Sequence, residues 1–156
     1  MRAVSHVAIG VSDMDRALHF YRDLLGLRVT LDTMERVGGR GPLFAGSQKG
    51  QRRAVYMRFE DGPHASFLVL SQNPGEPSGH PLKIDQVGLH HFSFWVDDLR
   101  ERVEKLKAAG VEILLPPTES DTVAYGEPPG GKVLTALFAD PDGTIVQFDQ
   151  RLSNQA

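Results

Sequence analysis

Apolar residues recur every three or four positions in two separate stretches of the chain, a spacing typical of one face of a helix. The repeating positions are Met14, Leu18, Tyr21 and Leu25 in the first stretch, and Leu99, Val103 and Leu106 in the second. Ser or Asp residues suited to helix N-caps precede both stretches, and Gly26 and Gly110 follow them. We therefore expect one helix in each half of the chain.

The same series of strands surrounds each expected helix. Residues 6–14 resemble residues 91–99 position for position, and an apolar strand leads into the helix in both segments. Further strands are expected at residues 27–30, 54–59 and 66–71, and again at 111–115, 133–139 and 144–150. The pattern predicts a β-α-β-β-β unit that occurs twice.

These elements predict an α+β fold of two tandem βαβββ modules that form a cupped mixed sheet around a cavity. The modules span residues 4–71 and 88–150, and the segment 72–87, with three prolines and two glycines, is the expected linker. The whole chain of 156 residues has the length of a single domain. Two stretches rich in Gly or Pro, residues 35–53 and 116–132, are expected to be long irregular loops.

Composition narrows the classes of function. A net charge of −3 provides no basic surface for nucleic acid or for an anionic membrane. The chain has no cysteine, so a metal could bind only through His, carboxylate, amide or water. No apolar segment is long enough for a signal peptide or a membrane span, which leads us to expect a cytoplasmic protein.

Alternation along the strands separates large apolar side chains from small or polar ones. In the first strand, Val7, Ile9 and Val11 form the row expected to pack on the helix, and His6, Ala8 and Gly10 form the opposite row. The opposite row of the matching strand holds His91, Ser93 and Trp95, whereas His90 is expected to face the other way. Small and polar rows of this kind are typical of a cavity wall.

The repeated unit, the histidine that opens each first strand, and the turn at Asp140-Pro141-Asp142-Gly143 followed by Gln147 resemble the vicinal oxygen chelate superfamily. This group includes glyoxalase I, extradiol dioxygenases, methylmalonyl-CoA epimerase and bleomycin resistance proteins. The resemblance covers nearly the whole chain. It implies a small-molecule substrate and a homodimer, with the site formed within one chain or shared between two.

The resemblance also implies a divalent metal, such as Fe, Mn, Ni, Zn or Co, held by the first and last strands of both modules. The ligand positions fall on His6 and His91 in the first strands, and on Val69 and Gln147 in the last strands. Val69 cannot bind a metal, and Gln147 offers a neutral amide oxygen where relatives usually carry Glu. The expected ligands are therefore His6, His91 and Gln147, with other positions open to water or substrate.

Each candidate residue also has a structural interpretation. The two histidines could be hydrogen-bonded core residues, and Gln147 could be a structural amide. Asp149 and Tyr125 are candidates for proton transfer, but the favoured interpretation of Asp149 is a solvated carboxylate at the end of a strand. Residues that could line the substrate pocket, or simply pack or reach solvent, are Trp95, Phe67 and Arg58.

Two functions fit these residues. The first is a metal-dependent enzyme with dioxygenase or lyase/isomerase chemistry, acting on a small compound with neighbouring oxygen atoms. The alternative is a metal-free protein, similar to bleomycin resistance proteins, that sequesters an aromatic drug. The enzyme is the leading interpretation, and Val69 and the absence of a carboxylate from the expected ligand set are the observations that argue for the alternative.

Overall fold

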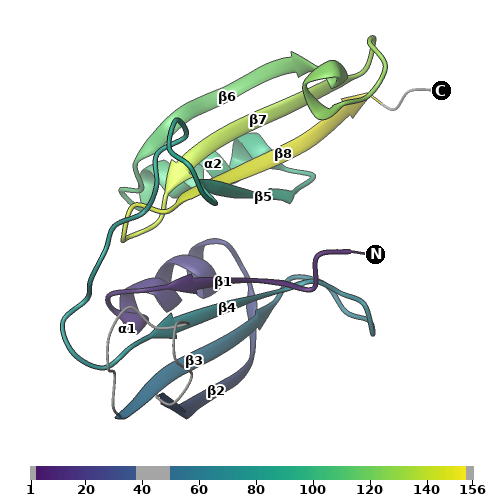
Figure 1. The fold of residues 1–156 in the computed structure, drawn as a ribbon. Helices are drawn as coiled ribbons and strands as arrows, with labels where there is room; N and C mark the ends of the chain where they lie inside the picture. Colours follow the sequence, from purple (N-terminus) through teal and green to yellow (C-terminus); the bar gives the residue numbers. More distant parts are fainter. Residues whose placement is uncertain (1–2, 38–49, 154–156) are drawn as a thin grey trace. The chain divides into compact units, whose positions relative to one another are not determined.

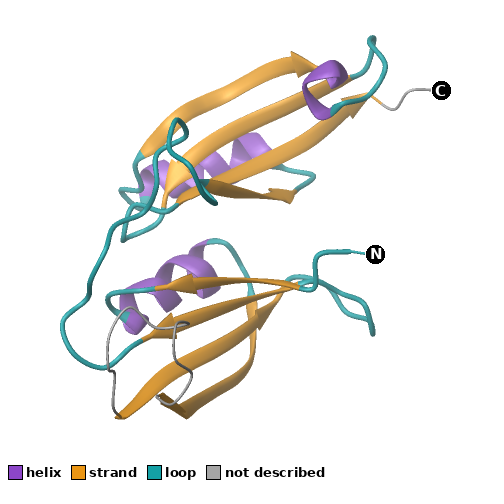
Figure 2. Ribbon diagram, in the orientation of Figure 1, coloured by secondary structure: helices purple, strands orange, loops and turns teal. Residues whose placement is uncertain are grey.

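The computed structural model describes residues 3–37 and 50–153. The chain divides into two compact units, Met1–Gly79 and His80–Ala156, and the boundary falls within the expected linker. Each unit contains one four-stranded sheet with a helix on one face (Figures 1 and 2). Within the described residues, no helix combines the length and the apolar character that crossing a membrane requires.

The first module forms a mixed sheet with the strand order β1-β4-β3-β2. Its strands are β1 (His6–Gly10), β2 (Arg28–Val37), β3 (Gly50–Arg58) and β4 (Phe67–Gln72). Its helix α1 (Met14–Leu18) connects β1 to β2 and continues into a π-helical segment, His19–Leu24. β1 runs parallel to β4, and the other neighbouring strands are antiparallel.

The second module repeats this topology with the order β5-β8-β7-β6. Its strands are β5 (His91–Trp95), β6 (Ile113–Asp121), β7 (Lys132–Ala139) and β8 (Ile145–Ser153). Helix α2 (Leu99–Ala108) follows β5, and a short 3-10 helix, Thr122–Tyr125, follows β6. The expected α+β class and the two βαβββ modules are confirmed.

The helix ends lie where the sequence places them. The Asp13 side chain accepts a hydrogen bond from the backbone N–H of Arg16 (3.0 Å) at the start of α1. Gly26 and Gly110 have positive φ angles of 85° and 78°, a conformation that glycine adopts without strain. The π-helical segment was not expected, and its bond from Leu25 N–H to Phe20 C=O is 3.0 Å.

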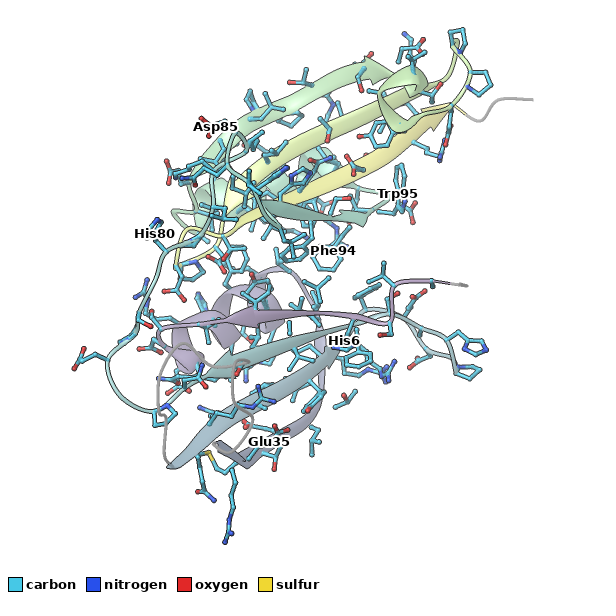
Figure 3. All side chains as sticks on the ribbon, viewed as in Figure 1. His6, Glu35, His80, Asp85, Phe94 and Trp95 are labelled. Carbon is cyan, nitrogen blue, oxygen red and sulfur yellow. The ribbon has the colours of Figure 1, made fainter. Side chains whose placement is uncertain are left out.

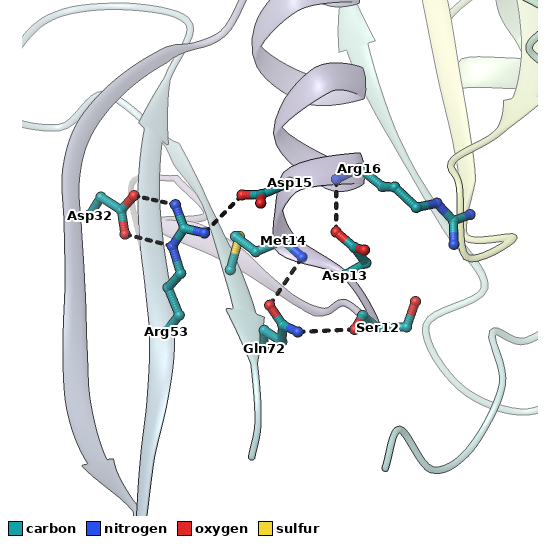
Figure 4. A network of polar contacts seen from close by, with 8 residues as sticks. All are labelled: Ser12, Asp13, Met14, Asp15, Arg16, Asp32, Arg53 and Gln72. Carbon is teal, nitrogen blue, oxygen red and sulfur yellow. Dashed lines mark hydrogen bonds and ion pairs between the residues drawn. The ribbon is translucent and has the colours of Figure 1, made fainter. Parts of the chain in front are cut away.

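A glutamine of the last strand, Gln72 at the end of β4 and Gln150 within β8, holds the start of the helix in each module. Gln72 accepts a hydrogen bond from the Met14 N–H (3.0 Å) and donates one to the Ser12 carbonyl (3.1 Å), as Figure 4 shows. Gln150 makes the same two contacts in the second module, with Leu99 N–H (3.0 Å) and the Asp97 carbonyl (2.7 Å). The repeated amide thus satisfies backbone groups that a helix start leaves without partners.

The core of each module lies between the sheet and its helix. In the first module it contains Val55, Met57, Leu68 and Leu70, each no more than 2% exposed. In the second it contains Ala136, Phe138, Val146 and Phe148, again no more than 2% exposed. These residues alternate with the other row of each strand, so the sheet faces opposite the helices carry the candidate site residues.

The two expected loops were predicted too long, because strands extend into both of them and residues 122–125 form a 3-10 helix, which leaves residues 126–131 irregular in the second. β2 extends to Val37 and β6 to Asp121, and β3 begins at Gly50, while residues 38–49 lie outside the described part. β6 contains Pro116 and Pro117, and its pairing with β7 shifts between Leu115 and Thr118. An edge strand tolerates prolines at such an irregularity, because it need not donate hydrogen bonds to a second neighbour.

Candidate functional site

His6 lies at the first position of β1, on the face opposite α1 (Figure 3). It is exposed and pairs in register with Phe67, whose ring stacks on the imidazole with centroids 5.0 Å apart. The Arg58 guanidinium covers the Phe67 ring at 5.0 Å. Three expected site residues therefore form one stack in the first module. The Ser5 hydroxyl lies 3.0 Å from His6 Nδ1, which leaves Nε2 as the ring nitrogen directed away from this contact.

A polar cluster that sequence reasoning missed lies on the same face of this sheet. Glu35 Oε2 accepts hydrogen bonds from two N–H groups of Arg52 (2.7 and 3.0 Å), and Glu35 Oε1 accepts one from Tyr56 (2.8 Å). The Tyr56 hydrogen bond to Glu35 raises the pKa of this phenol above its ordinary value. The sequence analysis assigned Glu35 and Arg52 to an irregular loop. The missed signal is that Arg52 and Tyr56 are four residues apart, so in one strand their side chains lie on the same face.

Val69 occupies the ligand position expected in the last strand of the first module. It pairs with Ala8 on one side and with Tyr56 on the other, and it is 6% exposed. An apolar side chain at this position supplies no donor atom. The first module therefore offers His6 as its one expected ligand.

His91 opens β5 as His6 opens β1, but its immediate neighbour differs. The Nδ1 atoms of His90 and His91 are 2.6 Å apart, so one of these two nitrogens carries the shared proton. Burial lowers the pKa of His91, and the nearby His90 lowers it further, whereas Asp149 opposes the shift. The expectation that His90 faces away was wrong, because His90 precedes the strand and strand alternation does not govern it.

Gln147, Asp149 and Tyr125 form one hydrogen-bonded group in the second module. Asp149 Oδ1 accepts hydrogen bonds from Tyr125 Oη (2.6 Å), Thr135 Oγ1 (2.5 Å) and Gln147 Nε2 (2.8 Å). Asp149 is only 1% exposed, which contradicts the interpretation as a solvated carboxylate. Burial raises the pKa of Tyr125 to about 12, and the hydrogen bond to Asp149 acts in the same direction.

Trp95 ends β5 on the same face and remains 56% exposed. The Arg151 guanidinium covers its ring at 4.9 Å, and the Tyr125 ring lies 5.8 Å away. Arg151 is itself held by a salt bridge to Glu127. The indole therefore has a fixed partner on one side and a large solvent-exposed area, which suits contact with a flat molecule.

The structure thus groups the expected site residues into two sets, one in each module. His6, Phe67 and Arg58 belong to the first sheet, and His91, Gln147, Asp149, Tyr125 and Trp95 belong to the second module. Convergence of His6 with His91 and Gln147 on a common ion stays a prediction. Among residues 3–37 and 50–153, no three or more His, Asp or Glu side chains gather in an arrangement that could hold a metal.

Comparison with known proteins places this architecture in a family. The model of the Glyoxalase/Bleomycin resistance protein/Dioxygenase superfamily matches residues 3–148. The chain belongs to this superfamily. A glyoxalase family protein from Bacillus cereus shares the fold of this superfamily member, with a TM-score of 0.74 and 18% identity over 98% of this chain and 96% of that protein.

Two curated relatives of this superfamily member extend over nearly the whole chain. A lactoylglutathione lyase from Haemophilus influenzae is 26% identical over 98% of this chain and 96% of its own length. An ethylmalonyl-CoA/methylmalonyl-CoA epimerase from Cereibacter sphaeroides is 29% identical over 94% of this chain and 96% of its own length. Both relatives are named as enzymes, and each matches this chain over nearly its own full length.

Proposed function

We propose that this protein is a divalent-metal-dependent enzyme that acts on a small compound with neighbouring oxygen atoms. Lyase or isomerase chemistry is favoured over dioxygenase chemistry, because the two full-length relatives are named a lyase and an epimerase. The orientation of the Gln147 amide is the observation that carries the proposal. Its nitrogen donates to Asp149, so its carbonyl oxygen is the group left to bind a metal.

The proposed ligands are His6, His91 and Gln147, two imidazoles and one amide. A divalent ion held by neutral ligands keeps its full charge, and it would act as a strong Lewis acid toward a bidentate anionic substrate. Imidazole nitrogen and amide oxygen suit Fe, Mn, Co, Ni or Zn, so the donor types fit such an ion. Val69 adds no donor, which leaves coordination positions for the two oxygens of a substrate.

The remaining candidates have roles that the contacts support. The Tyr125 hydroxyl, hydrogen-bonded to Asp149 beside Gln147, is the group we propose to transfer a proton. We propose that Trp95 and the stack of Phe67 and Arg58 bind the rest of the substrate. A homodimer is also proposed, on the basis of membership in this superfamily alone.

Metal analysis of protein purified without chelator tests the proposal. Stoichiometric metal is expected in the wild type, and His6→Ala and His91→Ala should both lose it. His64→Ala is the matched control, because His64 is exposed in a turn outside the sheets and its removal should leave the metal content unchanged. Metal-free wild-type protein, or equal metal content in all four proteins, would contradict the metal proposal.

A metal-free sequestration protein is the second candidate, and the 56% exposure of Trp95 favours it. An exposed indole and a buried Val69 suit a flat apolar ligand better than an ion. Fluorescence of this chain's single tryptophan reports such binding directly. Tight quenching by an aromatic compound that a chelator leaves unchanged would support sequestration, whereas quenching that requires added metal would support the enzyme.

A further inference from the structure

The Gln147 amide donates a hydrogen bond to a buried carboxylate, that of Asp149. Asp149 follows Gln147 by two residues on β8, so both side chains belong to the same face of the sheet. The carboxylate is 1% exposed, and its Oδ1 atom lies 2.8 Å from Gln147 Nε2. We propose that Asp149 is a positioning residue, which holds the Gln147 amide so that its carbonyl oxygen, and not its N–H group, is offered to a ligand.

The argument begins with the asymmetry of an amide. The two ends of the Gln147 amide have similar shape, but one end donates two hydrogen bonds and the other only accepts. A carboxylate accepts hydrogen bonds and has none to give. Turning the amide by half a turn would therefore bring two acceptor oxygens together, one of them on the buried carboxylate of Asp149, and neither could donate a hydrogen bond to the other. Asp149 excludes that orientation.

Asp149 is itself held from two other elements. Tyr125, at the end of the 3-10 helix, and Thr135, on β7, approach the same Oδ1 atom at 2.6 and 2.5 Å. A carboxylate with three donors on one oxygen has little freedom to rotate away from Gln147. The amide orientation is therefore fixed by the fold and does not depend on the presence of a ligand.

Comparison of the two modules shows that the fold does not require the pair formed by Gln147 and Asp149. Val69 and Ser71 occupy the corresponding positions in β4, where the last strand pairs with β1 in the same parallel register. The glutamine that fastens the helix, by contrast, is present in both modules as Gln72 and Gln150. A βαβββ module thus forms without the carboxylate and amide pair, which indicates that this pair serves the site.

The first experiment measures the amide itself and needs no metal. In nitrogen-15 NMR spectra of the whole protein, the Gln147 side-chain amide protons should exchange more slowly than those of Gln51, which is exposed. Asp149→Leu should remove this protection, whereas Thr135→Val, which removes a different donor to the same oxygen, should retain it. Equal exchange of the two glutamines in the wild type would overturn the inference, and so would protection that survives in Asp149→Leu.

The second experiment asks whether the carboxylate acts through Gln147, and this step rests on the proposed metal function. Cobalt(II) affinity is measured by titration for the wild type, Asp149→Leu, Gln147→Leu and the double variant. Relative to the wild type, Asp149→Leu should bind cobalt(II) about tenfold more weakly. Relative to Gln147→Leu, the double variant should bind cobalt(II) with unchanged affinity. Equal losses in both backgrounds would overturn the positioning role and indicate a general structural effect.

The two experiments fail in distinguishable ways. If no variant and no wild-type protein binds cobalt(II), the metal function is wrong, and the amide exchange alone decides the positioning inference. If the wild type binds cobalt(II) but Gln147 is unprotected, the inference is wrong and the metal function stands. Should Asp149→Leu not fold, Asp149→Ser replaces it, because Ser71 occupies the corresponding position in the first module.

Discussion

The Tyr125 hydroxyl donates a 2.6 Å hydrogen bond to the buried carboxylate of Asp149. This contact joins the 3-10 helix after β6 to the last strand of the sheet. Burial, and after it this contact, disfavour ionisation of Tyr125, because a buried phenolate is poorly solvated and is repelled by the neighbouring carboxylate. The pKa of about 12 for Tyr125 follows from that environment.

Tyr125 is therefore expected to weaken the fold at alkaline pH. In the unfolded chain it titrates near its ordinary pKa of 10.0, and in the folded chain at about 12. Between these two pKa values the folded state keeps the Tyr125 proton, whereas the unfolded state has lost it. The stability that Tyr125 contributes is therefore complete below pH 10.0 and is lost as the pH rises to about 12. Denaturation curves of the wild type and Tyr125→Phe measure this, and the variant should lose less free energy of unfolding over the interval. An identical alkaline loss in both proteins would contradict it.

Glu35→Gln should lower the pKa of Tyr56. The hydrogen bond to Glu35 is the main cause of the raised pKa, and a neutral amide removes the negative charge that disfavours the phenolate. Ultraviolet titration of tyrosinate resolves the change, with Tyr56→Phe used to assign the transition among the three tyrosines of the chain. An unchanged titration of Tyr56 in Glu35→Gln would show that burial, and not Glu35, controls this residue.

Gln72→Ala should destabilise the protein by about 1–3 kcal/mol, because it leaves a buried backbone donor without its partner. The N–H group of Met14, a residue that is 1% exposed, and the Ser12 carbonyl both lose their hydrogen bonds to the side chain. Urea denaturation measures the difference. The matched control is Gln51→Ala on the exposed part of β3, which should change stability by less than about 0.5 kcal/mol. Equal effects of the two substitutions would contradict the fastening role.

Gly131→Ala should cost about 1–3 kcal/mol through overpacking. A Cβ atom at this position would lie 2.5 Å from Thr122 Cγ2, and Thr122 is 1% exposed and hydrogen-bonded to the Pro128 carbonyl. The same substitution at Gly10 is the control, because no atom lies within 4 Å of the added carbon. Thermal denaturation of the two variants should separate them clearly, and equal melting temperatures would show that Thr122 moves aside without cost.

The module plan was predictable because local signals at the helix ends and along the strands agree. Gly26 and Gly110 occupy left-handed conformations, and Asp13 caps its helix as its residue type suggests. Phe67 was expected to line the substrate pocket, and it lies beside His6 in the parallel register and stacks on its ring. These features depend on neighbours close in sequence or on the period of a single strand.

The remaining features depend on contacts that no local pattern encodes. Asp149 looked like a solvated carboxylate because its three donors come from separate segments, among them Tyr125 and Thr135. The salt bridge of Arg53 to Asp32 and Asp15, drawn in Figure 4, links β3 to both β2 and α1. Arg53 was assigned to a loop because the Gly-rich segment before it concealed the start of β3.

The twin amides Gln72 and Gln150 have a practical consequence for redesign. The glutamine contact at the start of the helix is present in both modules, whereas the pair formed by Gln147 and Asp149 is present in the second module and not at the corresponding positions of the first. Exchanging Val69 for Gln and Ser71 for Asp would copy the ligand-orienting pair into the half that lacks it, at positions whose backbone register already matches. A change of chemistry can therefore be confined to one half of the chain, because the contacts that hold each helix lie at other residues.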